Sequence, residues 1–246
     1  MKHEQRTYRN LMNRGKRSFY RVTVKESDLC VHTDPPLEKL AGELLLQYRG
    51  YIENYISANP EFARTLKPWH ISGPTPKIIR DMAEAGKKAG VGPMAAVAGT
   101  VAEYVGRELL KHSPEVIVEN GGDIFLKTDT PMTLAIYAAQ SPLSLKVGLR
   151  INAVEKAQAV CTSSGTVGHS LSLGKADAVC AVSGSCALAD AAATAIGNHV
   201  KSESHIQGAI EFGKKIDGLR GLVVIIGDKI GMWGDIEVVP VGTQGH

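Results

Sequence analysis

The spacing of apolar residues changes about halfway along the chain. In the first half they recur every three or four positions, which is typical of amphipathic helices. The pattern is clearest in one segment, where the apolar positions are Leu37, Leu40, Ala41, Leu44, Tyr48, Tyr51, Ile52 and Tyr55. Similar spacing predicts further helices over residues 76–88 and 93–111.

Short apolar runs bounded by turn residues dominate the second half, and these are typical of strands. They lie on both sides of Asn-Gly-Gly-Asp at 120–123, and over 132–139, 145–151, 157–164, 176–183 and a closing hairpin at 219–241. Two short strands are also expected within 17–33, and helices over the alanine-rich segment after residue 185 and over 204–216. The absence of regular βαβ alternation predicts an α+β fold, with an antiparallel-rich sheet packed against helices. We expect one domain over residues 1–246, with a hairpin, long helix and connector in 1–75 and the core in 76–246.

Composition fits a globular protein, with 43% hydrophobic and 22% charged residues and a net charge of +3. The basic residues near the start are expected to form a solvated arm, and no motif predicts specific nucleic-acid binding. No apolar leader or membrane-length apolar run is visible, so a cytoplasmic protein without membrane contact is expected. The four cysteines include no C-x-x-C pair, which favours reduced thiols.

The segment CALADAAATA carries a carboxylate, Asp190, and a hydroxyl, Thr194, four residues apart. That spacing places both on one face of a helix, and the surrounding alanines leave room for close approach. Carboxylate and hydroxyl oxygens suit Mg²⁺, and the free N–H groups of a first helical turn favour anions. The pair could therefore hold a metal against a pyrophosphate. The alternative is an aspartate that caps a plain packing helix.

Two other segments have a functional and a structural interpretation. The segment Asn120, Gly121, Gly122, Asp123 is either a hairpin turn or a bare backbone surface for a flat ligand. The segment CTSSGTVGHS, with Thr162, Ser163, Gly165 and His169, is either a phosphate-binding loop or a polar connection. Cys161, Cys180 and Cys186 are expected to be buried, although a position near a helix start could lower the pKa of Cys186.

The order of these motifs resembles the ApbE superfamily of flavin transferases. A glycine-containing helix, AAVAGTVAEYVGRELL, precedes VENGGDIFL, then CTSSG, then CALADAAATA, over roughly residues 90–200. The resemblance implies Mg²⁺-dependent cleavage of FAD, transfer of FMN to a protein threonine or serine, and release of AMP. It also implies the roles of individual residues. Asp190 and Thr194 would be metal ligands and, with His169, catalytic; Asn120, Gly121, Gly122 and Asp123 would bind flavin; and Thr162, Ser163 and Gly165 would lie beside the diphosphate.

The chain also departs from the transferases. Of their H-x-x-D-P-x-T-G segment only His169 is present, and the front segment YIENYISANPEFARTLKPW is unlike theirs. The chain is more similar to a separate, uncharacterised cytoplasmic branch that has been linked to sulfur transfer in homocysteine synthesis. Three functions therefore stay open: a flavin or nucleotide-diphosphate transferase, a sulfur-transfer protein with a persulfide on Cys161 or Cys186, and a non-catalytic flavin-binding module. A homodimer and a protein acceptor are possible partners.

Overall fold

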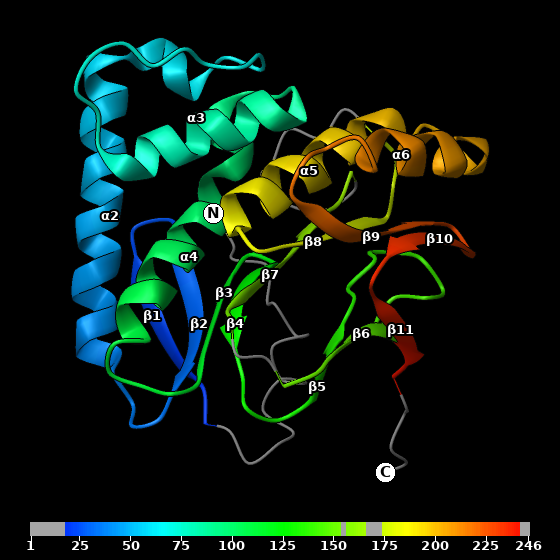
Figure 1. Cartoon of the computed structure of the whole chain (residues 1–246), viewed down its shortest axis with the longest axis horizontal. Coiled ribbons are helices and arrows are strands. Elements are labelled where there is room, and N and C mark those ends of the chain that lie inside the picture. The colour runs from blue at the N-terminus through cyan, green and yellow to red at the C-terminus, as the bar shows by residue number, and fades with distance from the viewer. Residues whose placement is uncertain (1–17, 154–155, 166–173, 242–246) are drawn as a thin grey trace.

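The computed structural model describes residues 18–153, 156–165 and 174–241. In this part of the chain, helices, a large antiparallel sheet and a small antiparallel sheet lie in successive layers (Figure 1). None of the helices there is both long and apolar enough to cross a membrane.

The large sheet consists entirely of antiparallel pairs. Its spatial order is β1 (Tyr20–Val24), β2 (Ser27–Thr33), β3 (Val116–Asn120), β4 (Asp123–Lys127), β7 (Gln158–Ser163), β8 (Ala178–Ser183), β9 (Leu219–Ile226) and β10 (Lys229–Gly234). Antiparallel pairing allows the short turns that join β1 to β2, β3 to β4 and β9 to β10. The β1–β2 hairpin pairs with β3, so the front of the chain extends the sheet that carries the motifs.

Helices cover one face of this sheet (Figure 1). They are α2 (Glu38–Ala58), α3 (Lys77–Ala89), α4 (Val97–Leu109), α5 (Cys186–His199) and α6 (Ile206–Gly213). Helices α4 and α5 lie over the middle strands, α4 against β3 and β4 and α5 against β7 and β8. Alternate strand residues such as Val118, Phe125 and Cys161 point into this helix-side core.

The opposite face of the large sheet packs against a small sheet of β11 (Glu237–Pro240), β6 (Val147–Ile151) and β5 (Met132–Ala135). Ile117, Val160 and Val223 of the large sheet form a second core there with Leu134 and Leu149 of the small one. The middle strands, such as β3 and β8, are thus buried on both faces, which explains why their apolar runs are nearly continuous.

The α+β prediction is confirmed, and three elements differ in detail. Residues 93–96 form a 3₁₀ turn before α4, with Pro93 at the first position, where a helix does not need its N–H group. The strand expected over 132–139 ends at Ala135, and Ala139 has a positive φ of 43°. The closing segment forms the expected hairpin as β9 and β10, but β11 then leaves it to pair with β6.

Candidate functional site

Two aspartates from distant parts of the sequence meet on the helix side of the large sheet. Asp123 is the first residue of β4 and is 5% exposed. Asp190 lies in the second turn of α5, where the residue is partly exposed but its carboxyl group is buried. The carboxyl groups of Asp123 and Asp190 lie within hydrogen-bonding distance of each other. Burial raises the pKa of both groups, and the charge of Asp190 raises that of Asp123 further. Two buried carboxylates in contact need either a shared proton or a cation.

The first turn of α4 connects the aspartate helix with the Asn-Gly-Gly-Asp segment. The Gly99 N–H donates to Asp190 Oδ2 at 2.9 Å, and Asn120 Nδ2 donates to the Ala98 carbonyl at 3.0 Å. A Cβ on Gly99 would lie 2.5 Å from the Cys186 carbonyl oxygen, so only glycine permits this approach of α4 to α5. Three separate segments thereby form one site.

Gly121 and Gly122 form a two-residue turn between β3 and β4, as the hairpin interpretation predicted. Their φ values are 69° and 107°, the positive values that a type I′ hairpin turn requires. Asn120 pairs with Asp123 across the ladder, which aligns their side chains on the helix side. The Gly122 N–H donates to Glu119 Oε1 at 2.9 Å. The hairpin interpretation does not exclude ligand contact, because the turn presents backbone without side chains beside the aspartates.

Thr194 lies one turn after Asp190 on the same helix and is 8% exposed. Among the described residues, no hydrogen bond to its hydroxyl group is present. The candidate metal ligands at this site are the carboxylates of Asp123 and Asp190 and the hydroxyl of Thr194. These hard oxygen atoms suit Mg²⁺. No group of three or more His, Cys, Asp or Glu side chains suited to a metal is found in the described ranges.

Only part of the Thr-Ser-Ser-Gly segment contacts the two aspartates. The Thr162 N–H hydrogen-bonds to Asp123 and stabilises its ionised form. The Thr162 hydroxyl instead hydrogen-bonds to the Cys180 thiol, which belongs to the second core, between the large and the small sheet. Ser163 ends β7 and is half-buried. The Gly165 N–H donates to the Ala176 carbonyl, and a Cβ there would lie 2.5 Å from the Gly174 carbonyl oxygen. Packing thus accounts for Gly165, and its role toward a diphosphate stays a prediction. His169 lies outside the described residues.

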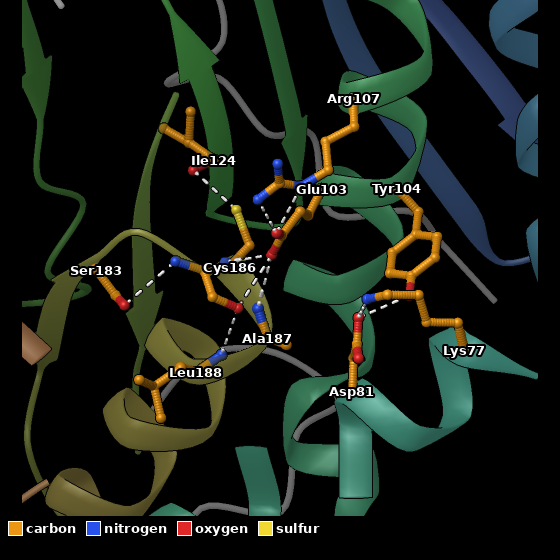
Figure 2. Close-up of polar contacts among 11 residues, drawn as sticks. Lys77, Asp81, Glu103, Tyr104, Arg107, Ile124, Ser183, Cys186, Ala187 and Leu188 are labelled. Atoms are coloured by element: carbon orange, nitrogen blue, oxygen red, sulfur yellow. Dashed lines mark hydrogen bonds and ion pairs between the residues drawn. The ribbon is translucent and has the colours of Figure 1, made fainter. Parts of the chain in front are cut away.

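The first turn of α5 is already occupied by protein groups, contrary to the expectation of free N–H groups for a pyrophosphate. Ser185 is the N-cap residue and accepts from the Leu188 N–H. Glu103 Oε2 accepts from the N–H of Cys186 at 2.6 Å and from the N–H of Ala187 at 3.4 Å (Figure 2). The alternative that Asp190 caps the helix is also wrong, because the N-cap residue is Ser185.

The cysteine thiols near the site are buried and hydrogen-bonded within the core. Cys161 and Cys186 are both 0% exposed, and Cys161 Sγ lies 3.5 Å from the Cys186 carbonyl oxygen. Burial raises the pKa of both thiols. At Cys186 desolvation is the largest contribution and outweighs the lowering by the hydrogen bond with Cys161. The expected burial of Cys161, Cys180 and Cys186 is observed.

Sequence reasoning missed Glu103. Gly99, Glu103 and Gly106 are spaced by four and three residues and share one buried face of α4. The sequence does place this carboxylate between two glycines on the small-residue face of a helix. A charge on such a face is buried only when it is paired, so this position could have predicted a partner for Glu103.

The family whose model matches this chain is described as AbpE bacteria, and the match covers residues 9–230. A UPF0280 protein of Methanosarcina acetivorans is 39% identical over 226 residues, which are 91% of this chain and 89% of that protein. A UPF0280 protein of Methanocaldococcus jannaschii is 40% identical over 222 residues, which are 88% of this chain and 90% of that protein.

Solved structures of flavin transferases share the fold. The flavin transferase ApbE of Vibrio cholerae matches with a TM-score of 0.56 and 14% identity, over 89% of this chain and 96% of that one. The flavinyl transferase ApbE of Pseudomonas stutzeri, in its apo form, matches with a TM-score of 0.55 and 14% identity, over 89% and 94% of the two chains. The chain therefore belongs to the AbpE bacterial family, in an ApbE-like branch that it shares with archaeal UPF0280 proteins.

Proposed function

We propose that this protein binds a flavin nucleotide such as FAD together with Mg²⁺, and transfers its FMN portion to a hydroxyl group of an acceptor protein. The observation that carries the proposal is the contact between the buried carboxylates of Asp123 and Asp190. The flavin-transferase fold and the order of the motifs supply the choice of ligand.

The residues present fit a magnesium ion. Asp190, Asp123 and Thr194 offer hard oxygen atoms, and the raised pKa of both carboxyl groups indicates that the pair lacks a compensating positive charge of its own. When bound, Mg²⁺ would neutralise charge on the diphosphate of the nucleotide during transfer.

The protein groups have separate tasks in this proposal. The Gly99 N–H fixes the Asp190 carboxylate, and Asn120 anchors the β3–β4 turn to α4. The Gly121–Gly122 turn would lie against the flat flavin ring. In the transfer, the acceptor hydroxyl oxygen bonds to the FMN phosphorus, the phosphorus–oxygen bond to AMP breaks, and the departing AMP phosphate takes up the hydroxyl proton. His169 is proposed to assist near the diphosphate.

The test is a calorimetric titration of the purified protein with FAD, with and without Mg²⁺, followed by chromatography for AMP. We expect Mg²⁺-dependent binding and slow AMP release, with water accepting the FMN phosphoryl group in place of the protein hydroxyl. We expect Asp190→Asn to weaken the Mg²⁺-dependent binding at least about tenfold, because it removes a ligand charge. Asp217→Asn is the control, since Asp217 is exposed and paired with Lys88.

Each other outcome replaces the proposal with a defined alternative. Flavin binding without AMP release, in the presence of candidate acceptor hydroxyls, would make the protein a non-catalytic flavin-binding module. No flavin binding by the wild-type protein would reject the flavin function altogether. If Asp190→Asn bound Mg²⁺ and FAD as tightly as the wild type, the metal would not be bound by Asp190 of α5.

A further inference from the structure

Glu103 is a buried carboxylate whose partners all belong to two helices. It is 7% exposed, on the face of α4 that packs against α5. Its Oε2 accepts from the N–H groups of Cys186 and Ala187 and, at 3.2 Å, from the Ser185 hydroxyl. Its Oε1 accepts from Arg107 Nε at 2.8 Å and Nη2 at 2.7 Å (Figure 2).

The contacts between α4 and α5 are reciprocal. Asp190 of α5 accepts from the Gly99 N–H in the first turn of α4, and Glu103 of α4 accepts from the first turn of α5. The two contacts are four residues apart on each helix, from Gly99 to Glu103 and from Cys186 to Asp190, in opposite directions. Each helix thus supplies a carboxylate to the positive end of the other helix dipole. The position of Glu103 along α4 therefore fixes the position of Asp190 relative to Gly99.

Helix α4 is itself held from its other side. The Tyr104 hydroxyl donates to Asp81 of α3 at 2.7 Å, and the Tyr104 ring packs edge-on against Tyr48 of α2 at 5.1 Å. Lys77 also binds Asp81, at 2.6 Å (Figure 2). These contacts hold α4 against α2 and α3, while α3, β7 and β8 pack against α5. Loss of the Glu103 contact would therefore change only the first turn of α5, which Glu103 holds directly.

We propose that Glu103 is a positioning residue for the metal site, which holds the first turn of α5 so that Asp190 meets Gly99 and Asp123. This inference rests on the proposed function for its metal. Without the Glu103 carboxylate, the N–H groups of Cys186 and Ala187 lose their acceptor, and the start of α5 is free to shift by a fraction of a turn. Asp190 then loses its alignment, although Glu103 touches neither metal nor substrate.

The test compares Glu103→Ala, Glu103→Gln and Glu108→Gln. Glu108 lies on the same helix, where it pairs with Lys111 on the surface, and so is a matched control. Mg²⁺ affinity is measured by calorimetry, and hydrogen exchange of the Gly99 amide by NMR in the metal-free protein. We expect Glu103→Ala to weaken Mg²⁺ binding about tenfold or more, the range seen when a residue that orients a ligand is lost. Glu103→Gln keeps one acceptor oxygen and should fall between Glu103→Ala and the wild type.

The Gly99 amide separates positioning from general stability. It should exchange faster in Glu103→Ala by more than the change in global unfolding explains, and at the wild-type rate in Glu108→Gln. A lower melting temperature with unchanged Mg²⁺ affinity and unchanged relative Gly99 protection would overturn the inference. If the wild-type protein binds no Mg²⁺, the proposed function fails, and the Gly99 amide alone decides whether Glu103 positions Asp190.

Discussion

At the scale of single residues, the Asp190 carboxyl group makes stability depend on pH. Its pKa is raised from 3.8 to about 7, chiefly by burial. The folded state therefore holds this proton more tightly than the unfolded state, so stability is lost as pH rises from about 3.8 to about 7. The N–H groups of Gly99 and Ala98 favour the charged form but do not outweigh burial.

Asp190→Asn should remove this penalty, because the amide keeps an acceptor for Gly99 and carries no charge. We measure the melting temperature of the variant minus that of the wild type, with a chelator present. This difference should be larger at pH 8 than at pH 4.5 by at least about 3 °C, since 1 kcal/mol corresponds to about 2–4 °C in a chain of this size. Thermal unfolding of both proteins across this pH range measures the difference. Parallel curves would show that Asp190 is not a buried, uncompensated charge.

At the scale of elements, the distance between α4 and α5 depends on Gly99. A Cβ there would lie 2.5 Å from the Cys186 carbonyl oxygen and 2.8 Å from Asp190 Cβ, so Gly99→Ala must push the helices apart. We expect a loss of about 1–3 kcal/mol in the free energy of unfolding, typical of overpacking, together with weaker Mg²⁺ binding. Urea denaturation and calorimetry measure the two effects.

Gly50→Ala is the control for this substitution, because Gly50 lies inside α2 and a Cβ there would meet nothing within 4 Å. It should stabilise the protein by up to about 1 kcal/mol through helix propensity alone. If both alanine variants changed the free energy of unfolding equally, the close contact at Gly99 would not be what limits the distance between α4 and α5.

At the scale of the whole molecule, local patterns predicted the elements better than their partners. The turn at Gly121–Gly122 follows from residues next to one another, and the shared face of Asp190 and Thr194 follows from helical spacing. The contact of Asp123 with Asp190 depends on strand order, and the contact of Glu103 with α5 depends on how two helices cross. Neither is encoded in a short segment, so no spacing rule could have given them. The departure of β11 to pair with β6 is non-local in the same way.

The burial of every cysteine gives a prediction for the molecule as a whole. Cys30, Cys161, Cys180 and Cys186 are all free and buried, so a thiol reagent reaches them only when the fold opens. We expect no fast-reacting thiol in the native protein and all four after denaturation, as measured by absorbance with a disulfide reagent. A persulfide carrier needs an accessible thiolate, whereas burial raises the pKa of Cys161 and Cys186. A native burst of one thiol, lost in Cys186→Ser and kept in Cys30→Ser, would contradict this prediction and favour the sulfur-transfer alternative over the flavin site.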